Sequence, residues 1–101
     1  MSKYYLGNFQ LLVMLAIQKL GGNKAYSASI IELLYIKTKK LHASGAIGET
    51  LNRLGEAGWV SRRLTNNTQG GGRKKMLYCL TKEGKKMLKK TLKAIDTLRH
   101  N

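Results

Sequence analysis

The side chains best suited to chemistry in this chain are basic residues that flank a run of glycines. Arg62 and Arg63 lie in one short apolar stretch, and Arg73, Lys74 and Lys75 begin another, with the glycines 70–72 between them. Guanidinium and ammonium groups bind phosphate oxygens, and glycine lets a backbone approach a ligand closely. The chemistry that this pattern predicts is the binding of a phosphate backbone.

The charge of the whole chain agrees with a polyanionic partner. Nineteen Lys and Arg oppose five acidic residues, which gives a net charge of +14 in 101 residues. A field of this strength repels itself within a small fold and is typical of proteins that bind nucleic acid. Charge alone leaves DNA, RNA and an anionic membrane surface open.

The remaining residue types argue against catalysis, metal binding and membrane insertion. The five acidic residues form no acid–base pair, and the only cysteine, Cys79, has no base near it in the sequence. The two histidines lie far apart, so no metal-ligand spacing exists. The longest apolar run covers residues 11–17, far short of the roughly 20 residues of a spanning helix, and no signal-peptide pattern is present. We expect a cytoplasmic protein without enzymatic activity, cofactor, metal or membrane contact.

The elements that must position the basic residues follow from the spacing of apolar residues. A period near 3.6 predicts helices over 9–20, 25–39, 44–57 and 82–100, with Asn8, Ser44 and Thr81 as N-caps. A period of two predicts strands over 59–64 and 75–80. The fold class is therefore mainly α with a small β-hairpin, and the order is that of a winged helix–turn–helix protein: three helices, a wing and a C-terminal helix.

This order assigns roles to the basic and small residues. The third helix enters the major groove, where Asn52 and Arg53 reach adenine and guanine edges. The small residues at its start allow close approach to phosphates. The predicted DNA-binding residues are Lys39, Lys40, His42, Ser44, Gly45, Gly48, Asn52, Arg53, Arg63, Arg73, Lys74 and Lys75, with Arg73 expected in the minor groove.

Several segments resemble the PadR family of bacterial transcriptional regulators. They are the stretches 44–47, 51–54 and 56–60, then Gly-Arg-Lys-Lys at 72–75 and the Leu-Thr-x-x-Gly motif at 80–84. The family often has a tyrosine where this chain has Gly48, so no role of that tyrosine carries over. The resemblance covers roughly residues 6–98.

The resemblance implies a homodimer that reads an inverted repeat, one half-site for each subunit. It implies that the last helix and the first helix hold the dimer together, and the first helix is apolar on nearly every side, which by itself indicates a second subunit. The expected interface residues are Phe9, Leu12, Leu88, Leu92, Ile95 and Leu98. The stripe on the last helix has the alternative of packing on the chain's own core. We expect residues 1–80 to form the DNA-binding domain and residues 81–101 the dimerisation helix of the same globular unit.

The sequence therefore predicts sequence-specific binding of double-stranded DNA by a dimeric transcriptional regulator, which we expect to repress. Two alternatives remain open: an RNA-binding basic domain, and a winged helix module that binds another protein. The short last helix leaves little room for the effector pocket that some family members build at the dimer interface, and no residue pattern supports a small-molecule effector.

Overall fold

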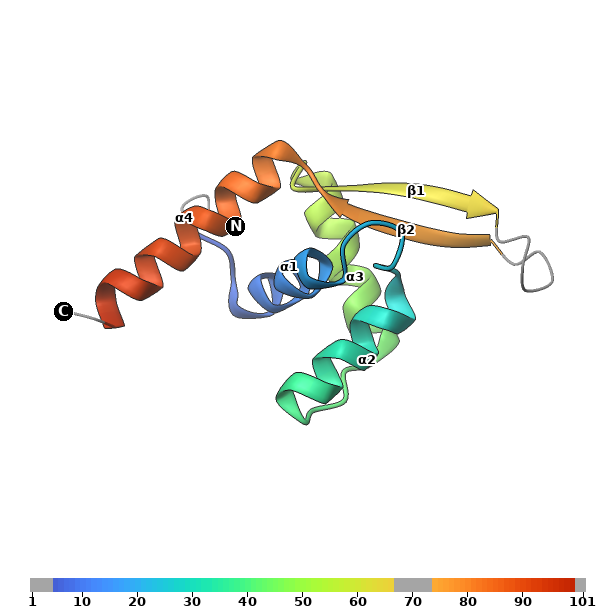
Figure 1. The fold of residues 1–101 in the computed structure, drawn as a ribbon, viewed down its shortest axis with the longest axis horizontal. Helices are drawn as coiled ribbons and strands as arrows, with labels where there is room; N and C mark the ends of the chain where they lie inside the picture. The colour runs from blue at the N-terminus through green and yellow to red at the C-terminus, as the bar shows by residue number, and fades with distance from the viewer. Residues whose placement is uncertain (1–4, 67–73, 100–101) are drawn as a thin grey trace.

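A computed structural model describes residues 5–66 and 74–99 of the chain. These residues form four helices and one antiparallel hairpin, in the order α1 (Asn8–Leu20), α2 (Ser27–Thr38), α3 (Ser44–Glu56), β1 (Val60–Asn66), β2 (Lys74–Leu80) and α4 (Lys82–Arg99). Figure 1 shows the hairpin extending to one side of the helical body and α4 extending to the other. The expected fold class, mainly α with a small hairpin, is confirmed.

The hydrophobic core forms around α1. Val13, Met14 and Ile17 are buried at the i, i+1 and i+4 spacing of one helix face, and each of the other helices presents apolar residues to them. The contributions from the remaining elements are Ile30, Leu34, Ile47, Leu51, Leu54, Val60, Tyr78 and Leu88. This core fixes α3 and the base of the hairpin relative to each other, and these two elements carry most of the predicted site.

Two of the predicted helix caps are wrong. Gly7, and not Asn8, is the N-cap of α1, and its backbone N–H donates to Oε1 of Gln10 at 3.1 Å. Ala43, and not Ser44, is the N-cap of α3, so Ser44 is the first helical residue. The Ser44 hydroxyl therefore sits too late in the chain to cap the first turn of α3.

The second helix begins two residues later than predicted because Ala25 has another partner. The carbonyl of Ala25 accepts a hydrogen bond of 2.8 Å from the backbone N–H of Tyr78 in β2, which holds the α1–α2 link in an extended form against the hairpin. At the other end, Lys39 adopts a left-handed conformation with φ of 63° and ends α2. These two anchors fix the turn that leads into α3.

The hairpin pairs β1 with β2 in the register Val60↔Leu80, Arg62↔Tyr78 and Leu64↔Met76, so these pairs share one face of the ribbon. Tyr78 is buried, whereas Leu64 and Met76 are exposed. The predicted alternation of apolar residues is thus present in β2. The half of the hairpin farther from the helices stays exposed, because it extends beyond the helical core.

The start of α4 packs against the beginning of the hairpin and is hydrogen-bonded to the segment that precedes it. The Thr81 hydroxyl accepts from the Gly84 N–H at 2.9 Å and donates to the carbonyl of Gly58 at 2.6 Å, so the predicted cap is confirmed and also joins two segments. Gly84 lies directly against the backbone of Trp59. Further along α4, the buried Thr91 accepts a hydrogen bond from the Leu6 N–H at 3.1 Å.

Candidate nucleic-acid interface

The start of α3 leaves backbone donors open to a ligand. Within the described residues no side chain caps this helix, and no acidic residue lies in its first turn. The first N–H groups of a helix have no partner within the helix, and together with the helix dipole they favour an anion such as a phosphate. A Cβ placed on Gly45 or Gly48 would meet no described atom within 4 Å beyond its chain neighbours and the backbone of its own helix, so the surface here is open as well as small.

The two predicted base-reading residues lie on different flanks of α3. Asn52 faces the hairpin, where its Oδ1 accepts a hydrogen bond of 2.9 Å from Nη1 of Arg62. Arg53 lies on the side of the first turn of α1 and forms an ion pair of 3.8 Å with Glu49 one turn earlier. Both are exposed, so both are accessible to a partner.

Glu49 is a part of this surface that the sequence prediction missed, and Arg62, expected only as a basic residue of the wing, also contacts α3. The signal for Glu49 was its i, i+4 spacing from Arg53, which favours an ion pair on a helix. Arg62 was visible as a basic residue of the wing, but its partner Asn52 lies ten residues away on another element. Only the packing of the hairpin on α3 reveals that contact.

The predicted basic residues of the wing divide between two surroundings. Nη2 of Arg63 donates to Oδ1 of Asn23 at 3.0 Å, and Nζ of Lys75 lies 4.1 Å from the ring centroid of Tyr26. Both contacts tie the hairpin to the α1–α2 link and the start of α2. Lys74 is exposed at the beginning of β2. The prediction for Arg73 lies outside the described residues.

The predicted site residues just before α3 also differ in their accessibility to a partner. Lys39 and Lys40 are exposed, as a phosphate contact requires. The His42 ring packs against Phe9 with their centroids 4.9 Å apart, and its Nε2 is buried with no hydrogen-bond partner in the described part of the chain. His42 therefore links the turn to α1, and its Nε2 does not face solvent.

The predicted interface residues of α4 differ sharply in accessibility. Leu88 is only 1% exposed and packs in the chain's own core, whereas Leu92, Ile95 and Leu98 are 38%, 39% and 78% exposed. Phe9 and Leu12 of α1 are partly buried against the same core. Of the predicted interface residues, those most accessible to a partner thus lie in the C-terminal half of α4.

The described residues offer neither a cluster of metal ligands nor a helix that could span a membrane. They hold no group of three or more metal-ligating side chains that would suit an ion. They also contain no helix with the length and apolar character needed to cross a bilayer.

Helices α2 and α3 form a helix–turn–helix pair, and the basic hairpin packs beside α3. This arrangement defines a winged helix–turn–helix protein. No protein-family model and no curated protein matches the chain. Solved structures do match it, and they identify the group of winged helix proteins that it resembles.

Several of these solved structures are PadR-family regulators. A PadR-like transcription factor from Bacteroides fragilis shares 26% identity over 91% of this chain and 84% of its own, with a TM-score of 0.72. A PadR-family regulator from Clostridium difficile shares 22% identity over 93% of both chains, with a TM-score of 0.74. PadR from Bacillus subtilis, solved with operator DNA, shares 22% identity over 84% of this chain and 46% of its own, with a TM-score of 0.69. The chain therefore has the PadR-like winged helix fold, and the resemblance noted in the sequence is confirmed.

Proposed function

We propose that the chain binds double-stranded DNA sequence-specifically as a transcriptional regulator, with α3 in the major groove and the hairpin over the adjoining backbone. The observation that carries this proposal is the hydrogen bond between Arg62 and Asn52, which joins wing and α3 in one surface. The open start of α3 and the exposed Lys39, Lys40 and Lys74 supply anion-binding groups around it. The complex of Bacillus subtilis PadR with operator DNA supports the choice of DNA as partner.

We propose further that the protein acts as a homodimer. The apolar residues Leu92, Ile95 and Leu98 support this, because they are exposed at a spacing of three residues along α4 and neighbouring exposed apolar side chains are typical of a protein–protein contact surface. In this arrangement residues 1–80 bind one half-site of an inverted repeat, and residues 81–101 hold the subunits together. Occupation of an operator is the simplest way for such a dimer to act, so we propose repression, in the cytoplasm, without enzymatic activity.

The test is a titration of labelled duplex with protein at several salt concentrations, followed by fluorescence anisotropy. If each subunit makes about four phosphate contacts, the logarithm of affinity falls with the logarithm of salt at a slope of about −7. Arg53→Ala and Arg73→Ala are each expected to weaken binding. Variants that both bind as tightly as the wild type would show that the proposed surface is wrong.

Two further results would favour the other readings of the sequence. Tighter binding to structured RNA than to duplex DNA would indicate an RNA-binding domain. A monomer in light scattering that shows no salt-sensitive DNA binding would indicate a protein-interaction module.

Leu98→Asp tests the dimer, because it places a charge on the most exposed leucine of α4 and leaves the buried Leu88 untouched.

A further inference from the structure

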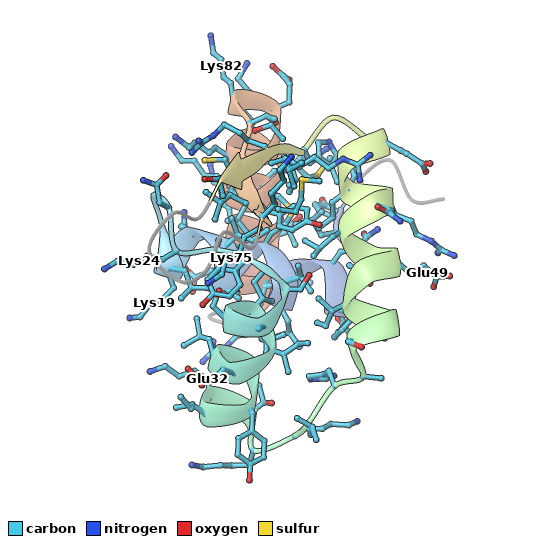
Figure 2. The ribbon with its side chains drawn as sticks, turned by 90° about the vertical axis from the view of Figure 1, so that its right-hand side faces the viewer. Lys19, Lys24, Glu32, Glu49, Lys75 and Lys82 are labelled. Atoms are coloured by element: carbon cyan, nitrogen blue, oxygen red, sulfur yellow. The ribbon has the colours of Figure 1, made fainter. Side chains whose placement is uncertain are left out.

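The outward face of α3 carries acidic residues in a strongly basic protein. The chain has only five acidic residues against nineteen basic ones, and Glu49 and Glu56 both lie on this helix. Successive residues turn by about 100° around a helix, so Glu49 and Glu56 point opposite to the buried Leu51 and Leu54. In Figure 2 Glu49 projects outward from α3, away from the side on which Glu32 of α2 lies.

A carboxylate in this place is unfavourable for binding a phosphate backbone alone. It repels phosphates, and it lowers the positive potential that supports non-specific affinity. The same group is useful in reading bases, because an ionised carboxylate accepts hydrogen bonds and donates none. In the major groove, cytosine presents a donor at N4, whereas guanine presents the acceptors O6 and N7.

We propose that Glu49 is a specificity-determining residue that accepts a hydrogen bond from the N4 amino group of a cytosine in the half-site. This inference rests on the proposed DNA binding and adds the recognition of one base to it. Glu49 fits the role better than Glu56 because residues in the N-terminal part of a recognition helix reach the base edges, whereas Glu56 is the last residue of α3.

The surroundings of Glu49 suit this role. Its side chain is 70% exposed, and neighbouring Gly45 and Gly48 have open space where a side chain would stand, so the helix can approach the groove closely. Arg53 lies 3.8 Å away with 66% exposure. A solvent-exposed pair of this kind is weakly held and can exchange its contacts for base edges, with Arg53 on guanine and Glu49 on cytosine.

The test is selection of binding sites from a randomised duplex library by the wild type, Glu49→Gln and Glu32→Gln. Both substitutions remove one negative charge, but Glu32 lies on α2, away from α3. Binding of each protein to the selected duplex, to a copy with the cytosine replaced and to an unrelated duplex is then measured. We expect Glu49→Gln alone to lose about tenfold of the preference at one C·G pair, a size typical of a good base contact.

The outcomes separate this inference from the proposed function. A preference for cytosine that Glu49→Gln loses and Glu32→Gln keeps supports the assignment. If the wild type selects a defined motif and Glu49→Gln selects it with the same base preferences, the role of Glu49 is refuted while DNA binding stands. If the wild type enriches no motif, sequence-specific binding and the role of Glu49 fail together. Equal melting temperatures of the three proteins verify that the fold is unchanged.

Discussion

The substitution Gly84→Ala tests how the hairpin and α4 are held together. A Cβ at this position would overlap the carbonyl oxygen of Trp59 and lie 2.8 Å from its carbonyl carbon, whereas ordinary contacts begin at 3.4 Å. These are backbone atoms, so no side-chain rotation relieves the overlap. The start of α4 must therefore move away from Trp59.

The expected loss of folding stability follows from the contacts that this movement disturbs. The carbonyl of Trp59 accepts the N–H of Thr81 at 3.1 Å, and a shift of about 1 Å breaks this bond, which costs about 1 kcal/mol. Overpacking adds about 1–3 kcal/mol. The better helix propensity of alanine offsets about 1 kcal/mol of this loss in stability. The net loss is about 2 kcal/mol, which lowers the melting temperature of a domain of this size by roughly 8–16 °C.

The assay is thermal and urea unfolding followed by circular dichroism, with Gly55→Ala as the control. A Cβ on Gly55 would meet only the carbonyl oxygen of Val60 at 3.9 Å, an ordinary contact, so this helical glycine gains stability from alanine. The two variants are thus expected to shift stability in opposite directions. A Gly84→Ala protein as stable as the wild type would refute the close approach of α4 to Trp59.

Three further predictions concern single side chains. Thr91→Val keeps the shape of a buried side chain but removes the acceptor of the Leu6 N–H, so we expect a loss of about 1–3 kcal/mol in urea unfolding, and no loss would contradict a buried hydrogen bond there. Thr81→Ala removes the cap of α4 together with the hydrogen bond to the Gly58 carbonyl and is expected to lower stability by about 1–2 kcal/mol, whereas Thr81→Ser retains most of that stability because the hydroxyl remains. Lys74→Ala is expected to reduce the salt slope of DNA binding by about one for each subunit, without changing base preference; an unchanged slope would remove Lys74 from the phosphate contacts.

The sequence predicts the elements of this fold well because their patterns are local. The 3.6 period of α3 and α4, the period of two in the hairpin and the Thr81 cap all depend on neighbours within a few residues, and each is present in the structure. The wrong N-caps of α1 and α3 are shifts of one residue, whereas the start of α2 is misplaced because a distant partner decides it. Ala25 fits a helical pattern but its carbonyl accepts from Tyr78, fifty-three positions later.

The residues of the candidate site likewise divide into those that the sequence identifies and those that only the packed fold identifies. Residue type and placement on a helix point to Asn52 and Arg53 from sequence alone. The inward orientation of His42 depends on Phe9, thirty-three positions earlier, and the involvement of Arg62 depends on the packing of the hairpin beside α3. Leu88 illustrates the same limit: its position in an amphipathic stripe is readable, but only the packed fold shows that the stripe divides between the core and an exposed end.

The most direct test of the central claim, that α3 reads base sequence, is a comparison of affinities for a selected duplex and an unrelated duplex of equal length at one physiological salt concentration. We expect the wild type to prefer the selected duplex by at least about a thousandfold. Asn52→Ala is expected to lose roughly tenfold of that preference while its affinity for the unrelated duplex stays the same, since Asn52 contacts bases and carries no charge. A wild type that binds both duplexes equally would contradict the account.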